Sequence, residues 1–151
     1  HINAMNKLLK QLSERAVELS TGEFWGMTRM DDVITIFGAF DDAAQKSESL
    51  IGMAMVFIIP RPEGPVAEIH NVVVAPEYRG QRIGDRLTQL LLEAVQESAD
   101  RDRRKIPLYL TSKPSRVAAN ALYIKHGFEL VAQATGEHGT NLYKRIMLPK
   151  V

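Results

Sequence analysis

The chain has 151 residues, of which 45% are hydrophobic and 25% are charged, and these are the proportions of an ordinary globular protein. A net charge of +1 argues against non-specific binding to nucleic acid. The lack of cysteine excludes disulfides, thiolate metal ligands and a cysteine nucleophile. We find no membrane-spanning stretch and no signal peptide, so we expect a cytoplasmic protein.

The sequence His-Ile-Asn-Ala before Met5 resembles the remnant of an expression tag, so we expect a single domain over residues 5–151. Helical spacing of apolar residues predicts a helix over Asn6–Leu19 and a shorter one over Thr21–Met30. The second helix carries large apolar side chains that favour a core position over a ligand site, namely Trp25, Met27 and Met30.

Six segments have the apolar patterns of strands: Val33–Phe40, Ile51–Ile59, Val66–Val74, Ile106–Thr111, Phe128–Ala134 and Asn141–Leu148. Loops join the first three, which predicts an antiparallel meander. A long helix from Ile83 follows the third strand and predicts a parallel crossover to the fourth. A helix over Ser115–His126 ends at Gly127. We therefore predict an α/β fold of the α+β type, with a mixed sheet of six to seven strands and four helices.

The segment Val72–Leu92 organises the rest of the chain. Valines end a strand, Pro76 stops its hydrogen-bonded ladder, and a turn that contains Gly80 and Gly84 leads directly into the long helix. The first N–H groups of a helix lack partners within it, and with the helix dipole they favour an anion such as phosphate. Glycines allow a ligand to approach the backbone closely.

Positive charge surrounds this turn. Arg79, Arg82 and Arg86 lie in or beside it, and residues 61–151 carry 14 basic against 10 acidic side chains, whereas residues 1–60 carry 5 against 8. The turn matches neither G-x-G-x-x-G nor a Walker loop with its lysine. Local chemistry leaves two interpretations: a phosphate-binding turn, or an ordinary strand–turn–helix with arginines on a solvated face.

Val72–Leu87 resembles the acetyl-CoA-binding motif of the GNAT superfamily of N-acetyltransferases, whose pattern is Arg/Gln-x-x-Gly-x-Gly/Ala after a strand. Arg79 fills the first position and Gly84 the last, but Arg82 replaces the usual middle glycine, so its side chain must point away from the pyrophosphate or lie along it. The resemblance implies that acetyl-CoA is the acyl donor and contacts Val72, Val73, Val74, Arg79, Gly80, Gln81, Arg82, Ile83, Gly84 and Asp85.

A second segment, Ser112–Phe128, resembles the downstream GNAT motif, in which an Asn and a Leu-Tyr pair precede Gly-Phe. The two motifs occur in the family's order, and the resemblance covers about Ile51–Tyr143. Arg116, Asn120 and Tyr123 lie at i, i+4 and i+7, so on a helix they share one stripe that could line a cleft for acetyl-CoA. The alternative is that Asn120 satisfies buried backbone groups and Tyr123 is a core ring.

Acetyl transfer from a thioester to an amine requires an anchored donor, a deprotonated amine, donors for an oxyanion and a proton for the departing thiolate. The resemblance implies that a backbone N–H near the end of Val72–Val74 binds the oxyanion. It also implies that Asn120 holds a pantetheine amide and that Tyr123 is the general acid.

The general base has two interpretations. Glu68 and His70 alternate onto one face of their strand, and imidazole titrates close to neutral pH. In one interpretation, either residue accepts the proton through a water. In the other, bulk solvent is the proton acceptor. The other histidines, His1, His126 and His138, lie in the tag, near a helix end and in a Gly136–Gly139 turn, and no metal-ligand cluster is expected.

Asn141 and Tyr143 resemble part of the last strand in one bacterial branch of the superfamily. They either face the acceptor site or belong to an alternating edge strand. The fold would place substrate choice in Leu19–Asp32 and Pro60–Pro65, and final strands of such sheets often pair into homodimers. Two other functions compete: a catalytically idle CoA-binding sensor or docking module, which Arg82 favours, and a nucleotide-binding switch, which lacks the P-loop lysine.

Overall fold

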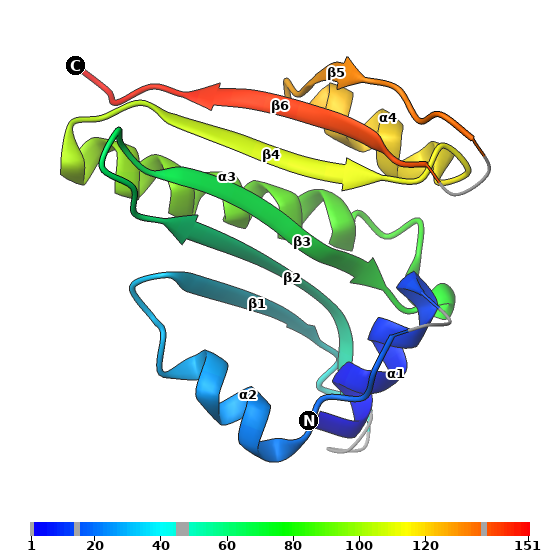
Figure 1. Cartoon of the computed structure of the whole chain (residues 1–151). Helices are drawn as coiled ribbons and strands as arrows, with labels where there is room; N and C mark the ends of the chain where they lie inside the picture. Colours follow the sequence, from blue (N-terminus) through cyan, green and yellow to red (C-terminus); the bar gives the residue numbers. More distant parts are fainter. Residues whose placement is uncertain (1, 14–15, 45–48, 137–138) are drawn as a thin grey trace. The chain divides into compact units, whose positions relative to one another are not determined.

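The computed structural model of the chain describes residues 2–13, 16–44, 49–136 and 139–151. Its elements in chain order are α1 (Ile2–Leu12), α2 (Thr21–Thr28), β1 (Ile34–Phe40), β2 (Leu50–Ile59), β3 (Val66–Val74), the 3₁₀ turn η1 (Pro76–Tyr78), α3 (Ile83–Asp102), β4 (Ile106–Ser112), α4 (Val117–Lys125), β5 (Glu129–Ala132) and β6 (Asn141–Met147). Within these described ranges, six strands form one mixed sheet in the order β1-β2-β3-β4-β6-β5 (Figure 1). The predicted fold class, with four helices and six strands, is confirmed.

The strand directions also agree with the prediction. In Figure 1 the arrows of β1, β2 and β3 alternate, as in a meander. β3 and β4, on either side of α3 in the sequence, pair in parallel through Ala67–Leu108 and Glu68–Tyr109. β6 pairs antiparallel with both β4 and β5. β6 is therefore an inner strand and β5 is the edge, so the interpretation of Asn141 and Tyr143 as edge-strand residues is wrong.

The chain forms two compact units, each made of two sequence segments. Unit 1 comprises His1–Val56 and Asn71–Leu91, and unit 2 comprises Phe57–His70 and Leu92–Val151. The turn between β3 and α3 belongs to unit 1. The segment with Asn120 and Tyr123 belongs to unit 2, as do Glu68 and His70.

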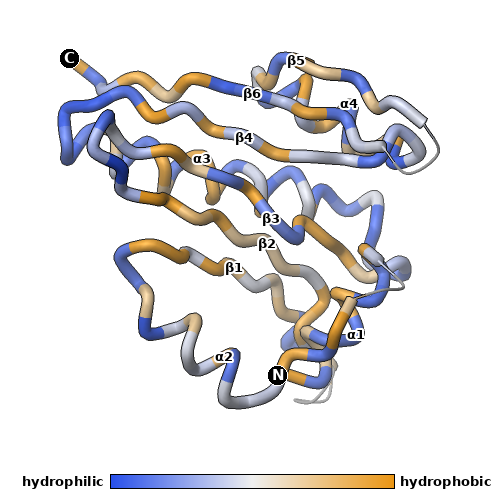
Figure 2. The backbone as a smooth tube through the Cα atoms, in the orientation of Figure 1, coloured by the Kyte–Doolittle hydropathy of each residue, from blue (hydrophilic) through white to orange (hydrophobic). Residues whose placement is uncertain are grey.

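In unit 1, the core forms around the start of β2. Every residue of Leu50–Val56 is buried, and the tube along β2 is largely hydrophobic (Figure 2). Gly52 allows α3 to pack closely here, because an added Cβ would lie 3.2 Å from the Val73 carbonyl oxygen and 3.3 Å from Leu87 Cδ1. The start of α3 therefore packs directly onto β2, which fixes the helix end that follows the glycine turn.

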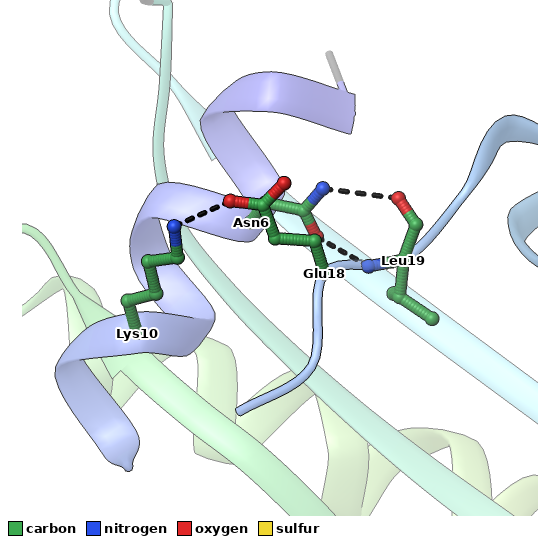
Figure 3. A network of polar contacts seen from close by, with 4 residues as sticks. All are labelled: Asn6, Lys10, Glu18 and Leu19. Carbon is green, nitrogen blue, oxygen red and sulfur yellow. Dashed lines mark hydrogen bonds and ion pairs between the residues drawn. The ribbon is translucent and has the colours of Figure 1, made fainter. Parts of the chain in front are cut away.

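The first helix differs from its prediction at both ends. Ile2–Ala4 belong to α1 and Ala4 is buried, so these residues are part of the fold whatever their origin, while His1 lies outside the described residues. At the other end, α1 stops at Leu12, because Asn6 holds the returning chain (Figure 3). The Leu19 N–H donates to Asn6 Oδ1 (2.9 Å), and Asn6 Nδ2 donates to the Leu19 carbonyl (3.0 Å).

The second helix begins as its sequence predicts but does not enter the core. Ser20 and Glu23 form a reciprocal capping box that starts α2. No side chain of α2 is buried, and Trp25 and the following Met30 are 58% and 50% exposed. The predicted core position is therefore wrong for Trp25 and Met30, because the apolar residues of α2 do not recur on one face.

The core of unit 2 lies between helices and one face of its strands. Alternate residues of β4 are buried while Tyr109 and Thr111 face the other way. In Figure 1 the carboxyl-terminal half of α3 and α4 lie behind the strands. The buried side chains that these elements contribute are Leu92, Val95, Ala99, Ile106, Leu108, Leu110, Tyr123, Phe128, Tyr143 and Met147.

Candidate active site

The turn after β3 is tied to its surroundings before α3 begins. The Ala75 N–H donates to the Ile51 carbonyl at 2.8 Å. The Tyr78 hydroxyl, at the end of η1, donates to Asp41 Oδ2 at 2.7 Å. That bond is the main reason why the pKa of Asp41 lies below its usual value, and the Ala43 N–H adds to the effect. The turn is thus held from two sides within unit 1.

Two residues of the turn have left-handed backbone conformations. Gly80 has φ +77°, and an added Cβ would meet nothing within 4 Å, so the space beside this backbone is open. Arg82 has φ +63°, which costs a residue with a side chain about 1 kcal/mol. The motif's usual glycine at position 82 matches this conformation. Arg82 therefore retains the backbone of a glycine turn at a cost in strain.

The Arg82 side chain follows the first turn of the helix. Its Nη2 lies 3.2 Å from Asp85 Oδ2, and the side chain is 83% exposed. The Arg86 N–H donates to the Arg82 carbonyl (3.0 Å), which begins the helical ladder. The N–H groups of residues 83–85 precede the first acceptors of that ladder, and they are the donors that a phosphate requires.

Arg79 lies across the end of β3. Its Nε donates to the Val74 carbonyl (3.1 Å), and its Nη2 donates to Gln11 Oε1 (3.2 Å). These bonds use two of the five N–H groups of a guanidinium and fix its orientation. The remaining N–H groups can still bind a phosphate oxygen.

A feature that sequence analysis missed interrupts β3 just before its valines. Asn71 has φ +55°, and its Nδ2 contacts Met55 Sδ at 3.3 Å. A left-handed residue within a strand breaks the regular ladder. The available signal was the residue type, because asparagine tolerates this conformation better than other residues that carry a side chain.

Glu68 and His70 form a pair on β3. His70 Nε2 lies 3.2 Å from Glu68 Oε2, and both side chains are about half exposed, at 47% and 46%. The ring of Phe57 meets the imidazole edge-on, with centroids 5.1 Å apart. The carboxylate orients the imidazole and leaves Nδ1 for a second partner, which is the arrangement of a general base and its orienting group.

The end of α4 explains the sequence Leu-Tyr-Ile-Lys-His-Gly-Phe. Gly127 has φ +78°, its N–H donates to the Ile124 carbonyl (2.9 Å), and the Phe128 N–H donates to the Tyr123 carbonyl (3.0 Å). These two bonds define a Schellman motif, which is completed by the ring contact of Tyr123 with Phe128 at 6.1 Å. The predicted cap at Gly127 is confirmed, and the motif fixes the position of Tyr123.

Tyr123 lies in an aromatic cluster with Phe128 and with Tyr143, whose ring centroid is 5.9 Å away. Burial raises the pKa of Tyr123 to about 12; Tyr143 adds to the rise and Arg116 opposes it. Among the described residues, the Tyr123 hydroxyl has no hydrogen-bond partner. A phenol with this pKa stays protonated at physiological pH and remains a donor.

The contacts of Asn120 bear on both roles considered from the sequence. Its Nδ2 donates to the carbonyls of Lys113 (3.1 Å) and Pro114 (3.3 Å), so the amide does satisfy backbone groups. Its Oδ1 is buried and has no partner in the described part of the chain, and the same holds for Ser112 Oγ. A buried acceptor without a partner fits the N–H of a ligand amide, such as pantetheine provides.

The predicted stripe of three residues holds only in part. Asn120 and Tyr123 lie on α4, but Arg116 is the residue before the helix and has φ −85° and ψ 61°.

Asn141 Oδ1 accepts from the Ala134 N–H (3.0 Å), and Asn141 Nδ2 lies 3.5 Å from the Tyr143 hydroxyl. Asn141 therefore joins the start of β6 to the loop after β5, and His138 in that loop lies outside the described residues.

The structure thus assembles predicted residues within each unit. Unit 1 brings Val72–Val74, Arg79 and residues 80–85 together, and unit 2 pairs Glu68 with His70 and sets Asn120 and Tyr123 on one helix. Across residues 2–13, 16–44, 49–136 and 139–151, no three His, Asp or Glu side chains gather as metal ligands. None of the helices in those ranges is long and apolar enough for a membrane span.

The structure contains the features that the resemblance to an acyltransferase family predicts: a mixed sheet with a parallel crossover, a glycine turn at the crossover helix and a tyrosine on the next helix. The chain belongs to the acetyltransferase (GNAT) family, whose model matches residues 4–128. No curated protein sequence matches the chain.

Solved structures of this fold resemble the chain along nearly its whole length. Arabidopsis thaliana NAA60 in complex with acetyl-CoA has a TM-score of 0.71 and 17% identity, with 97% of this chain and 93% of that chain covered. The ribosomal-protein-S18-alanine N-acetyltransferase of Escherichia coli has a TM-score of 0.68 and 17% identity, with 99% of this chain and 90% of that chain covered. A phosphinothricin acetyltransferase of Sinorhizobium meliloti in complex with acetyl-CoA has a TM-score of 0.69 and 19% identity, with 97% of this chain and 83% of that chain covered. At these identities the likeness shows the fold.

Proposed function

We propose that the protein transfers an acetyl group from acetyl-CoA to a primary amine of a small molecule or a protein. The observation that carries this proposal is the turn of unit 1, in which left-handed Gly80 and Arg82 lead directly into the first turn of α3. This turn has the chemistry of a pyrophosphate site, and it lies in a chain that belongs to an acetyltransferase family.

Groups from both family motifs would hold the donor. The first-turn N–H groups of α3 and the remaining N–H groups of Arg79 would bind the pyrophosphate. Asn120 Oδ1, which is buried without a partner in the described chain, would accept from a pantetheine amide. A backbone N–H of Val72–Val74 would bind the oxyanion, a contact typically worth about 10²–10³ in rate.

The reaction is proposed to proceed by direct attack in a ternary complex. The amine nitrogen bonds to the thioester carbonyl carbon, the C–S bond breaks, and the amine proton leaves to a base. Tyr123 would donate its hydroxyl proton to the departing thiolate. Because its pKa is raised to about 12, the phenol keeps its proton until the thiolate develops, so the proton is present when the C–S bond breaks.

Tyr123→Phe should lower kcat about 10²-fold, within the usual range for general acid catalysis. The measurement is release of CoA thiol with acetyl-CoA and a panel of polyamines, aminoglycosides and peptides with free amino termini. Tyr109→Phe is the matched control, because Tyr109 faces away from the buried core of unit 2. Equal turnover of the Tyr123 variant and the unmodified protein would remove Tyr123 from the mechanism.

The general base keeps its two candidates. The 3.2 Å pair of His70 with Glu68 supports the dyad, since the carboxylate can orient the imidazole. His70→Gln should then lower kcat/KM about tenfold at pH 7 and less at pH 9, where more of the amine is already deprotonated. A pH profile that coincides with that of the unmodified protein would favour bulk solvent as the acceptor.

The structural neighbours differ in acceptor: one is named for a ribosomal protein and another for phosphinothricin, a small molecule.

The runner-up function is an idle CoA-binding module. The protonated Tyr123 and the Glu68–His70 pair favour catalysis over that alternative. Calorimetric binding of acetyl-CoA without turnover of any amine would reverse the order. The cytoplasmic location and the homodimer expected from the sequence stay predictions.

A further inference from the structure

A hollow of about 740 Å³ opens in unit 2 between two loops that hold none of the proposed catalytic or acetyl-CoA-binding residues. One side is the β2–β3 loop with the first residue of β3, and the other is the turn from α3 into β4; Figure 1 shows the two loops side by side. The hollow is lined by Arg61, Pro62, Glu63, Gly64, Pro65, Val66, Arg104, Lys105 and Pro107. Its volume falls within the range of about 300–1,000 Å³ that is common for ligand pockets.

The charge of the hollow is predominantly positive. Three cations, Arg61, Arg104 and Lys105, face one carboxylate, Glu63. Arg61 Nε lies 4.0 Å from Glu63 Oε2, and both side chains are more than half exposed. Within the described part of the chain, the side chains of Arg104 and Lys105 have no hydrogen-bond or ion-pair partner. Figure 2 shows both loops as hydrophilic.

The backbone on both sides of the hollow is constrained. At the end of α3, Arg103 has φ +52°, its N–H lies 3.4 Å from the Asp100 carbonyl, and the Arg104 N–H donates to the Ala99 carbonyl (3.1 Å). This is a Schellman motif with arginine in the place of glycine. In the opposite loop, the Gly64 N–H donates to the Arg61 carbonyl (3.0 Å). Prolines at 62, 65 and 107 restrict the chain further, so binding would require little ordering.

The common explanation for cations after a helix is that they compensate its dipole. Arg101 already lies in the last turn of α3. Arg104 and Lys105 come after the left-handed residue that ends the helix, and both line the hollow instead. Compensation of the dipole would also give no reason for Arg61, on a different loop, to face the same space.

We propose that this hollow binds an acidic peptide segment of a partner protein. Arginine forks pair with carboxylates in a bidentate manner, and lysine adds a point charge. A nucleic acid is disfavoured by the net charge of +1, by Glu63 in the lining and by a volume suited to a few side chains. The hollow lies at the start of β4, whereas Asn120 bonds the residues that follow its end, so the peptide site is separate from Asn120.

The test is fluorescence anisotropy of a fluorescein-labelled octaglutamate peptide, with octaglutamine and a labelled octathymidylate as comparison probes, at low and physiological salt. Octaglutamate should bind more tightly than both, and the binding should weaken with salt. In Arg104→Ser/Lys105→Ser the affinity should fall about tenfold or more. The matched control is Lys7→Ser/Arg29→Ser, which removes the same charge from unit 1 and should change the affinity less than about twofold.

A charge-preserving variant, Arg104→Lys/Lys105→Arg, should retain most of the affinity and guards against a folding defect. Equal weakening in the hollow variant and the control variant would overturn the proposal, because it would show only general electrostatics. Tighter binding of octathymidylate would overturn it in favour of a nucleic acid. A hollow variant with a lower melting temperature and unchanged octaglutamate affinity would assign the cations to the helix dipole. Acetyl-CoA binding should be the same in all variants, so this test is independent of the proposed activity.

Discussion

The glycine turn of unit 1 and the aromatic cluster of unit 2 carry the proposed chemistry by opposite means. The turn, Arg79–Gly84, is mostly exposed, and it offers backbone N–H groups that need no particular side chain. The cluster of Tyr123, Phe128 and Tyr143 is buried, and it acts through one phenol whose pKa depends on its neighbours.

The difference predicts how each region responds to mutation. Substitutions in the turn should change ligand binding with little effect on stability, because few core contacts depend on these side chains. Substitutions in the cluster should change stability and activity together, since the same burial that raises the Tyr123 pKa also contributes to the core. Three predictions test this contrast, beginning with the largest effect.

Gly84→Glu should weaken acetyl-CoA binding at least about 100-fold, because it places a carboxylate beside donors that would bind phosphate. The melting temperature should be retained or rise slightly, since glycine within a helix is about 1 kcal/mol less favourable than residues with side chains. Calorimetry and thermal unfolding of the same sample measure both quantities. Loss of stability together with binding would break the contrast, because the turn would then behave like the core.

The pH dependence of stability should reveal the buried phenol. The folded pKa of Tyr123 is raised from 10.0 to about 12, so its stabilising contribution is complete below pH 10 and is lost as pH rises through 12. Between pH 8 and pH 11 the unmodified protein should therefore lose about 1.4 kcal/mol more unfolding free energy than Tyr123→Phe. Urea unfolding at both pH values measures the difference. Parallel losses in the two proteins would show that the phenol is not buried as described.

Arg82→Gly should raise the unfolding free energy by about 0.5–1 kcal/mol, because it relieves a left-handed arginine at the cost of one exposed ion pair. The acetyl-CoA affinity should stay within about threefold, since the side chain lies along Asp85 and the backbone donors are unchanged. Arg103→Gly is the control, with a similar gain in stability at a residue far from the turn in sequence. A large gain in affinity for Arg82→Gly alone would show that the arginine side chain obstructs the phosphate site.

The elements that the sequence predicted well are those whose cause is local. Pro76, the glycines and the apolar stripe of α3 determine the strand–turn–helix, and Gly127 determines the end of α4. The family motifs pointed to Tyr123 and Asn120, and the structure places them on one helix.

The elements that the sequence predicted poorly depend on distant partners. Asn6 ends the first helix by binding Leu19, thirteen residues away, and no periodicity reveals such a bond. The exposure of Trp25 depends on what packs against α2, which its composition does not specify. Arg82, Asn71 and Arg103 adopt conformations that favour glycine, and only the fold around them makes this visible.

The position of the basic hollow at one end of β4, with Asn120 beside the other, has a consequence for the sequence of a protein substrate. A seven-residue strand spans roughly 20 Å at about 3.3 Å per residue, and an extended peptide covers that distance in about six residues. A substrate that extended along β4 from the hollow would therefore need about six residues between its acidic segment and the part that lies beside Asn120. The length of β4 would thus set a spacing that the substrate's own sequence must match.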